Sequence, residues 1–399
     1  MSEVRVAGVT TETWAARTIG ETGKYINGLA FKPTDWGDEG MPIIRIQNLT
    51  NPAKPLNKTT RAVDPAYIVK SGDILVSWSA TLDAFIWDRE SALLNQHIFK
   101  VVPDTSVVTK KFLFYTLKKA IAEMTKSEHL HGSTMKHINR GPFLAHKIEV
   151  PTLEQQDEIV DELEKQFSRL DEAVANLQRV KANLKRYKDS VYSEAFGNAP
   201  NSTLGELIEV GPQNGLYLPK DMYGDGVPIL RIDDYQTAWI RPVRDLRRVI
   251  ATQEQISTWA LCEDDLVVNR VNSMTHLGKC VRIPKSLAGT VFESNMMRMR
   301  LTAAASPKYV EHYLASRLGK KRLTGNAKWA VNQASINQKD VRATPIFVPA
   351  LTTQLALVTE IDRQLSIVRE VEVEVDANLQ RAQALRQATL RNCFQSTVS

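Results

Sequence analysis

The chain contains very few cysteines and no long apolar run. Among its 399 residues only Cys262, Cys280 and Cys393 are cysteines, too few for a disulfide framework and typical of a reducing cytoplasm. No uninterrupted apolar stretch is long enough to span a bilayer. Residues 1–16 lack the charged-then-apolar order of a signal peptide. The sequence therefore predicts a cytoplasmic protein that does not enter a membrane.

The motifs of several enzyme classes are also missing. No Gly-x-x-x-x-Gly-Lys-Ser/Thr loop is present for ATP, and no glycine-rich cofactor loop follows a strand. Asn51-Pro52-Ala53-Lys54 lacks the second proline and the aromatic residue of a methyltransferase turn. The acid–lysine group in Glu162-Leu163-Glu164-Lys165 lies inside a long helical pattern, where such residues are normally solvated. We therefore expect no catalytic residue, no metal and no cofactor in this chain.

What the sequence does contain is an internal duplication. Val150-Pro151-Thr152-Leu153-Glu154-Gln155-Gln156 opens one long helical pattern, and Val348-Pro349-Ala350-Leu351-Thr352-Thr353-Gln354 opens another, 198 residues later. The same offset relates Ile138-Asn139 to Ile336-Asn337 and Phe196 to Phe394. The repeat predicts a pseudo-twofold molecule, and duplex DNA is a ligand with matching symmetry. The predicted domains are globular segments at 1–150 and 199–348, and long helices at 151–198 and 349–399.

Each globular segment is predicted to be mixed and strand-rich. β-branched residues alternate after glycine turns at 42–47 and 228–233, and matched strands follow at 72–78 and 264–270, then at 95–101 and 295–301. Short helices are expected at 110–123 and 307–323. Together with the long helices, these elements predict an α+β fold in which two strand-rich domains are separated by a long antiparallel two-helix coiled coil.

Positive charge is concentrated in the globular segments. Residues 1–150 contain 19 Lys+Arg against 15 Asp+Glu, a net charge of +4, and residues 199–348 contain 20 against 14, a net charge of +6. The helical segments 151–198 (7 against 10) and 349–399 (5 against 6) are mildly acidic. This distribution suits phosphate contact by the globular segments. A modestly basic protein without such a role would also account for it.

The two helical segments repeat apolar residues at three- and four-residue steps, as in a near-heptad seam. Thr152 and Gln155 form a candidate capping box at the first start. At ~1.5 Å per residue the first helix reaches about 65 Å. A single stripe of this length needs a partner, and we favour the other helix over separate packing on each domain. The predicted seam residues are Ile159, Leu163, Leu170, Val174, Leu177, Leu184 and Val191, with Leu357, Ile361, Leu365, Val368, Val375 and Leu385.

These features resemble the specificity subunit of type I restriction–modification systems. The resemblance rests on the Val-Pro-Thr-Leu-Glu-Gln-Gln opening at 150–156, the helix exit at 190–197 and the strand after the turn at 226–231. It covers about residues 18–395. In that family each globular segment is a target-recognition domain for one half of a bipartite, asymmetric DNA site. The subunit is non-catalytic, and the coiled coil sets the spacing between the two domains.

The resemblance also implies partners. They are double-stranded DNA, two methyltransferase subunits and two motor-nuclease subunits. S-adenosylmethionine is then expected only in the partner methyltransferase. A departure from the family pattern occurs at Ala350 and Thr352-Thr353, which leave the second helix start less clearly capped. Two alternatives stay open: a subunit of a related system in which one enzyme both cuts and methylates, and a coiled-coil scaffold whose heads bind proteins.

Base recognition needs donors and acceptors on rigid elements, with Arg or Lys for guanine and Asn or Gln for adenine. Candidates occur at matching places in both copies. In the first copy they are Asn27, Lys32, Arg45, Gln47, Ser77, Trp78, Ser79, Lys136, His137 and Asn139. In the second copy they are Asn214, Tyr217, Lys220, Arg231, Asn269, Arg270, Asn272, Ser273, Lys328, Trp329, Asn332 and Gln333.

Several candidates also have a purely structural interpretation. Arg45 and Arg231 could each form an intradomain ion pair, and Trp78 could belong to the core. Arg45 and Gln47 are expected on one strand face, since alternate strand residues point the same way. Asn269 and Arg270 are expected to face solvent at a strand exit. Because Trp78 matches Arg270 and Gln47 matches Asp233, the two half-sites are predicted to differ in sequence.

Overall fold

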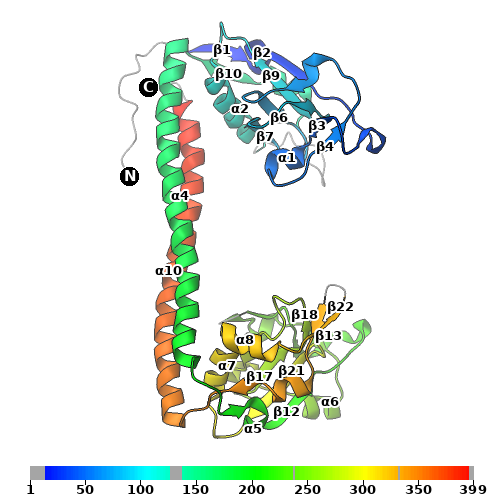
Figure 1. The fold of residues 1–399 in the computed structure, drawn as a ribbon, viewed down its shortest axis with the longest axis vertical. Coiled ribbons are helices and arrows are strands. Elements are labelled where there is room, and N and C mark those ends of the chain that lie inside the picture. The colour runs from blue at the N-terminus through cyan, green and yellow to red at the C-terminus, as the bar shows by residue number, and fades with distance from the viewer. Residues whose placement is uncertain (1–13, 126–136, 237–238, 331–332, 395–399) are drawn as a thin grey trace. The chain divides into compact units, whose positions relative to one another are not determined.

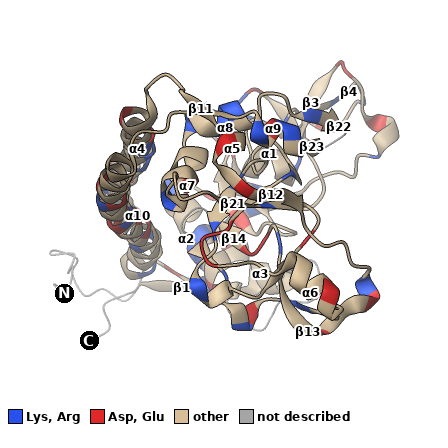
Figure 2. Cartoon of the chain, turned by 90° about the horizontal axis from the view of Figure 1, so that it is seen from below, with Lys and Arg blue, Asp and Glu red and all other residues tan. Residues whose placement is uncertain are grey.

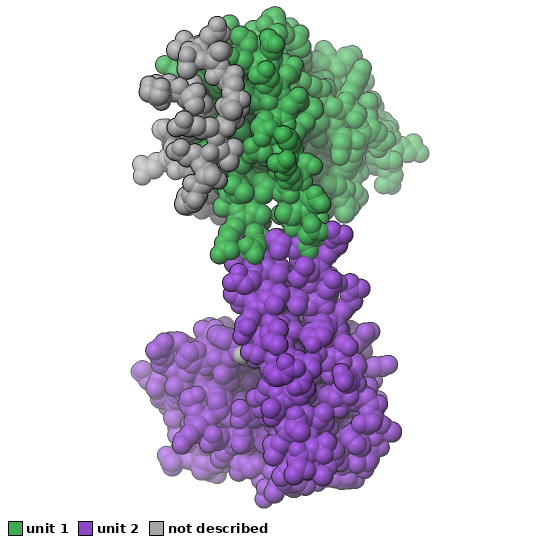
Figure 3. Space-filling model, turned by 90° about the vertical axis from the view of Figure 1, so that its left-hand side faces the viewer, with its two compact units in different colours: residues 1–176, 378–399 green, residues 177–377 purple. Residues whose placement is uncertain are grey.

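The structure is a computed structural model that describes residues 14–125, 137–236, 239–330 and 333–394. The chain divides into two compact units, which Figure 3 colours separately. Unit 1 comprises Met1–Asn176 and Asn378–Ser399, and unit 2 comprises Leu177–Ala377. Each unit therefore combines one globular segment with parts of both long helices. No helix among the described residues is long and apolar enough to cross a membrane.

Unit 1 contains two four-stranded sheets and a terminal strand pair (Figure 1). One sheet has the order β2-β9-β6-β7 and is antiparallel throughout. The other has the order β4-β3-β8-β5, in which β3 and β8 run parallel. The pair is β1-β10. The strands are β1 (Ala15–Thr18), β2 (Gly23–Asn27), β3 (Met41–Ile44), β4 (Asn57–Thr59), β5 (Ile68–Val69), β6 (Ile74–Ser77), β7 (Asp83–Ile86), β8 (Ala92–Leu94), β9 (Ile98–Pro103) and β10 (Lys147–Val150).

Unit 2 repeats this topology. Its main sheet has the antiparallel order β12-β21-β17-β19, and β16-β13-β20 includes the matching parallel pair, β13 with β20. The terminal pair is β11-β24, and β14-β15 and β18-β23-β22 are additional sheets. The strands are β11 (Ser202–Thr203), β12 (Ile208–Asn214), β13 (Tyr223–Leu230), β14 (Tyr235–Gln236), β15 (Trp239–Ile240), β16 (Arg248–Val249), β17 (Leu266–Asn269), β18 (Val271–Asn272), β19 (Cys280–Arg282), β20 (Val291–Phe292), β21 (Met296–Leu301), β22 (Lys328–Ala330), β23 (Gln333–Ser335) and β24 (Pro345–Ile346).

The main sheet of each unit is covered by short helices. In unit 1 this is α2 (Lys110–Met124), close to the predicted range. In unit 2 the sequence predicted one helix at 307–323, whereas the structure has two, α7 (Pro307–Ala315) and α8 (Arg317–Leu323). The break lies at Ser316, which follows α7 and caps the start of α8, because its Oγ accepts a hydrogen bond from Gly319 N at 2.9 Å. Further short α-helices are α1 (Ile46–Thr50), α3 (Arg140–Ala145), α5 (Leu204–Leu207), α6 (Gln253–Trp259) and α9 (Gln338–Arg342).

Two long helices, α4 (Leu153–Phe196) and α10 (Leu351–Cys393), follow the globular segments. The capping box at the start of α4 is confirmed, because Thr152 N donates to Gln155 Oε1 at 3.2 Å and Gln155 N donates to Thr152 Oγ1 at 3.3 Å. At the start of α10 the backbone amides of Thr353 and Gln354 donate to the carbonyl of Ala350.

A buried glutamine joins each long helix to its own globular segment. Gln156 Oε1 accepts a bond from Thr109 N at 2.7 Å, and its Nε2 donates to Val107 O and Pro151 O at 3.0 and 2.9 Å. Gln354 repeats this pattern 198 residues later. It accepts from Ser306 N at 2.9 Å and donates to Ala304 O and Pro349 O at 3.0 and 2.9 Å. Thr109 and Ser306 are the residues that cap α2 and α7, so each glutamine couples two helix starts.

The long helices pair in antiparallel fashion, as predicted. In unit 1 Arg386 pairs with Asp171 and lies 4.1 Å over the ring of Phe167. In unit 2 Lys181 pairs with Asp376 at 2.6 Å and Lys188 pairs with Glu372 at 2.8 Å. Residue numbers rise along α4 as those of their partners fall along α10. These charge pairs therefore specify one register, although each exposed pair contributes only about 0.2–1 kcal/mol.

Near its ends, each long helix also packs into a globular core. Ile159 and Leu163 belong to the core of unit 1, and Leu170 packs at its edge. Val191 and Ile361 belong to the core of unit 2, with Leu357 and Leu365 at its edge. The remaining seam candidates are buried (Val368, Val375) or half-buried (Val174, Leu177, Leu184). Leu385 is 53% exposed, so its assignment to the seam is wrong.

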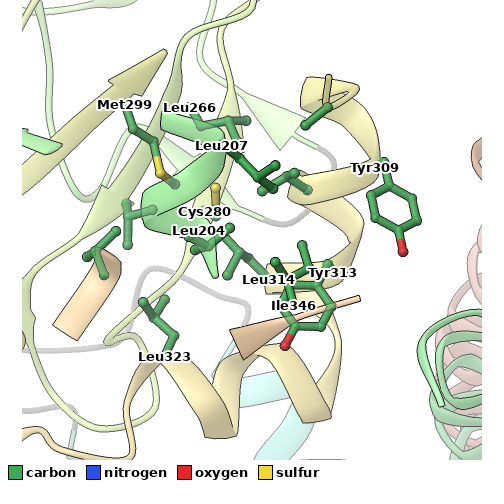
Figure 4. Close-up of a cluster of buried hydrophobic side chains, with 14 of the residues drawn as sticks. Leu204, Leu207, Leu266, Cys280, Met299, Tyr309, Tyr313, Leu314, Leu323 and Ile346 are labelled. Atoms are coloured by element: carbon green, nitrogen blue, oxygen red, sulfur yellow. The ribbon is translucent and has the colours of Figure 1, made fainter. Parts of the chain in front are cut away.

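The far end of each long helix completes the core of the unit that it enters. Phe196, at the end of α4, is 1% exposed, and its ring centre lies 5.3 Å from that of Tyr309 and 5.5 Å from that of Tyr313. Figure 4 shows part of this core, in which Leu204, Leu207 and Leu266 lie near Cys280, and Tyr313 lies beside Leu314 and Ile346. Phe394, just beyond α10, packs 5.1 Å from Phe112 of α2 in unit 1. Each unit thus needs parts of both helices.

Candidate nucleic-acid interface

In unit 1 the ends of several strands lie together and form what we call the strand-end surface, consisting of residues 27–29, 44–45, 77–79 and 95–97. Hydrogen bonds connect these segments: Gly28 N to Ile98 O at 3.0 Å, Asn95 N to Ile44 O at 3.3 Å, and Trp78 N to His97 O at 3.1 Å. The closing loop joins at the same place, because Ile138 N donates to Trp78 O at 3.0 Å. Loops on a rigid sheet are a common position for binding residues.

Unit 2 repeats this backbone framework in residues 214–216, 230–231, 269–273 and 293–295. The equivalent bonds run from Gly215 N to Met296 O at 3.0 Å, from Glu293 N to Leu230 O at 3.1 Å, and from Arg270 N to Asn295 O at 2.9 Å. Ile336 N donates to Arg270 O at 2.9 Å, matching the Ile138 bond. The two strand-end surfaces therefore share one framework.

Glycine is required at one point of this framework. A Cβ atom at Gly28 would lie 1.9 Å from the carbonyl oxygen of Asn95, and one at Gly215 would lie 2.2 Å from that of Glu293. No side chain fits such an approach. The two Asn-Gly turns therefore hold the 95–97 and 293–295 loops against β2 and β12.

The side chains on the shared framework differ. In unit 1 Trp78 is half-buried, with its ring centre 6.0 Å from that of Phe99 and 4.7 Å from that of His97. Its Nε1 donates to Asn27 Oδ1 at 3.2 Å. Trp78 thus packs against the core and also carries a polar contact at the exposed side. His97 has φ = 72°, an uncommon left-handed conformation for a residue other than glycine.

In unit 2 the position of Trp78 is occupied by Arg270, whose Nη1 donates to Ser294 O at 3.1 Å. Arg231 forms an intradomain ion pair, with its Nε 3.2 Å from Glu293 Oε2. Burial opposes the charged guanidinium and the Glu293 carboxylate favours it, and the net result is a pKa of Arg231 above its ordinary value. The ion-pair alternative raised for Arg231 is therefore what the structure contains.

Three expectations about candidate side chains are wrong. Asn269 does not face solvent: it is fully buried and accepts a bond from the Tyr235 hydroxyl, whose pKa burial raises well above its ordinary value. Ser77 is buried too, and its Oγ donates to the carbonyl of Thr81. Gln47 shares no strand face with Arg45, because β3 ends at Ile44 and Gln47 lies in α1.

Most of the other candidates lie at or near the surface. Tyr217 and Trp329 are 79% and 72% exposed, which is unusual for aromatic side chains. Exposed polar candidates are Asn27, Lys32, Gln47, Asn139, Asn214, Lys220, Lys328 and Gln333, and half-buried ones are Arg45, His137, Asn272 and Ser273. Ser79 is buried and bridges to His137. Lys136 and Asn332 lie outside the described residues. Figure 2 marks further Lys and Arg residues on α8 and α9.

Some residues of the two surfaces were missed by sequence reasoning. Asn95 and His97 were assigned to a strand, whereas they form the loop before β9. Their counterparts, Glu293 and Asn295, lie 198 residues further on, the same offset that relates the helix starts. Comparing each residue with the one 198 positions later would have found both pairs, Asn95 with Glu293 and His97 with Asn295.

Comparison with known proteins agrees with this architecture. Residues 11–185 match the family model described as the type I restriction modification DNA specificity domain. The specificity subunit of the type I restriction enzyme EcoKI from Escherichia coli K12 is 22% identical, over 98% of this chain and 91% of that protein. The StySPI specificity subunit from Salmonella potsdam is also 22% identical, over 98% and 90%. Over nearly its whole length, this chain is therefore similar to specificity subunits of type I restriction–modification systems.

Solved structures share the fold of this chain. A chain from a study of complex assembly and conformational transition in a type I R-M system has a TM-score of 0.77 at 15% identity, covering 97% of this chain and 99% of that one. The HsdS subunit from Thermoanaerobacter tengcongensis has a TM-score of 0.53 at 16% identity, covering 98% of both chains.

Proposed function

We propose that this chain is a non-catalytic subunit that selects the DNA site of a type I restriction–modification complex. The single observation that carries the proposal is the repeated strand-end framework, which presents different side chains in its two copies, Trp78 against Arg270 and Asn95 against Glu293. Because the two units share one framework, they can dock on their half-sites in a similar way. Because the side chains on that framework differ, the two units can recognise different base pairs. The expected target is therefore bipartite and asymmetric.

The proposed partners are those that the similarity to type I specificity subunits implies. Two methyltransferase subunits, which bind S-adenosylmethionine, would methylate adenine at the chosen site, and two motor-nuclease subunits would cut unmodified DNA. The chain itself would supply binding and orientation only. The net charges of +4 and +6 on the globular segments support contact with phosphates, and such contacts make affinity fall steeply with salt.

Random-site selection tests this proposal. The chain is combined with its methyltransferase subunits and bound to a library of random duplexes, and bound sequences are read. We expect two short, unlike sequence blocks at a constant gap, and a linear fall of log affinity with log salt concentration. A salt-independent interaction without a split consensus would contradict DNA recognition and favour a protein-binding scaffold.

The paired helices are proposed to set the gap. Four residues, about one helical turn, would be inserted between Asp171 and Lys181 of α4, with four more between Asp376 and Arg386 of α10. This design leaves the Arg386–Asp171 and Lys181–Asp376 pairs intact on either side of the insertion. The gap should change while both half-site sequences stay the same. Altered half-site bases at an unchanged gap would contradict the proposal.

A further inference from the structure

Two arginines occupy the same position in the repeated framework. Arg45 follows Ile44, the last residue of β3, and Arg231 follows Leu230, the last residue of β13. The residue beside each arginine is also matched, because Asn95 N donates to Ile44 O and Glu293 N donates to Leu230 O. Asn95 and Glu293 therefore stand in the same place relative to their arginines, and they differ in charge.

In unit 2 this neighbour neutralises the arginine. The side chain of Glu293 is 10% exposed, and its Oε2 lies 3.2 Å from Arg231 Nε. Its Oε1 accepts a bond from Ile232 N at 2.7 Å, which fixes the carboxylate in place. Taking either partner out of such a shielded pair leaves the other charge uncompensated. The guanidinium of Arg231 is therefore held in an ion pair with Glu293 within its own unit.

In unit 1 the arginine has no such partner. Asn95 is uncharged, and its Oδ1 makes no hydrogen bond within the described part of the chain. The guanidinium carbon of Arg45 lies 4.9 Å above the ring of Trp36, which orients the group without occupying its N–H donors. Arg45 forms no ion pair with any residue that the structure describes. Its charge and its donors stay available at the strand-end surface.

From this contrast we infer that Arg45 recognises a guanine in the half-site bound by unit 1, and that Glu293 withholds Arg231 from DNA in unit 2. The residue at position 95 or 293 thus decides whether the matched arginine takes part in base recognition. A planar guanidinium with two free N–H donors fits the O6 and N7 acceptors of guanine in the major groove. This inference rests on the proposed DNA-selecting function.

A reciprocal exchange tests it. Asn95→Glu places a carboxylate beside Arg45, and Glu293→Asn removes the one beside Arg231. In random-site selection with the methyltransferase subunits, Asn95→Glu should abolish one G·C preference in one half-site, a loss of about 10- to 100-fold in discrimination. Glu293→Asn should create a preference for one G·C pair in the other half-site.

Two further variants keep the result interpretable. Arg45→Leu should remove the same G·C preference as Asn95→Glu, so a failure of Asn95→Glu to fold would not remove the test. Arg61→Ala is the matched control, because Arg61 also lies over an aromatic ring, Phe31 at 5.6 Å, but pairs with Asp35 at 3.7 Å. Arg61→Ala should leave every base preference unchanged.

The outcomes separate the two proposals. If the unaltered chain selects no split sequence, DNA selection itself is refuted. If the unaltered chain selects a split sequence and folded Asn95→Glu and Arg45→Leu both retain it unchanged, only the assignment of Arg45 is refuted. Loss of different base pairs in these two variants would also overturn it.

Discussion

Replacing the buried glutamine at the start of a long helix should loosen one unit and leave the other intact. Gln156 is fully buried and makes three hydrogen bonds, to Thr109 N, Val107 O and Pro151 O. Leucine has a similar volume but neither donates nor accepts. Gln156→Leu would therefore leave one amide and two carbonyls without their partner.

The size of the effect follows from the burial of those groups. An unsatisfied buried donor or acceptor costs about 1–3 kcal/mol. Val107 and Thr109 are half-buried, so water can replace part of what is lost there, whereas Pro151 is buried. We expect Gln156→Leu to lower the free energy of unfolding of unit 1 by about 3 kcal/mol in total. Gln354→Leu should cost a similar amount in unit 2, because its three bonds match in kind and length.

The neighbouring glutamine offers a matched control. Gln155 is only half-buried and takes part in the capping box with Thr152, so Gln155→Leu should cost about 1 kcal/mol or less. Urea denaturation measures the loss, and hydrogen exchange locates it, since two units need not unfold together. Protection should fall at the starts of α2 and α4 in Gln156→Leu, and of α7 and α10 in Gln354→Leu. Equal stability of Gln156→Leu and Gln155→Leu, or loss of protection throughout both units, would refute this reasoning.

Two further predictions concern the cores. Phe196→Ala should lower the stability of unit 2 by about 3–5 kcal/mol, because it empties a site bounded by Tyr309 and Tyr313. Phe394→Ala should cost less in unit 1, because Phe112 is the one ring neighbour of Phe394 among the residues that the structure describes. A larger fall in the urea midpoint for Phe394→Ala than for Phe196→Ala would contradict this. Burial raises the pKa of Glu311 above its ordinary value of 4.5, although Arg282 N donates to it at 2.8 Å. Above pH 4.5 the Glu311 carboxyl loses its proton in the unfolded state but still holds it in the folded state. The free energy of unfolding therefore falls as pH rises from 4.5 through the pKa of Glu311 in the folded protein. Glu311→Gln should therefore gain stability over the parent at neutral pH but not at pH 4.5, and an equal difference at both pH values would refute the assignment.

Local and repeated patterns of the sequence were enough to predict the plan of the molecule. Apolar residues at three- and four-residue steps specify helices, and the 198-residue offset shows that the domain-plus-helix arrangement occurs twice. The antiparallel pairing of α4 and α10 followed from the need of two long stripes for a partner, and it is confirmed. The capping box of Thr152 and Gln155 involves neighbours in the chain, so it too was predictable.

Only the tertiary structure decided which polar residues remain available to a ligand. Arg45 and Arg231 look alike in sequence, yet Arg231 is paired with Glu293, which lies 62 residues away. Asn269 and Ser77 are polar residues at strand ends, but the fold buries both and uses them internally. Burial and pairing depend on side chains brought together from distant segments. Local periodicity carries no information about such partners, and the choice between structure and recognition is therefore made by the fold.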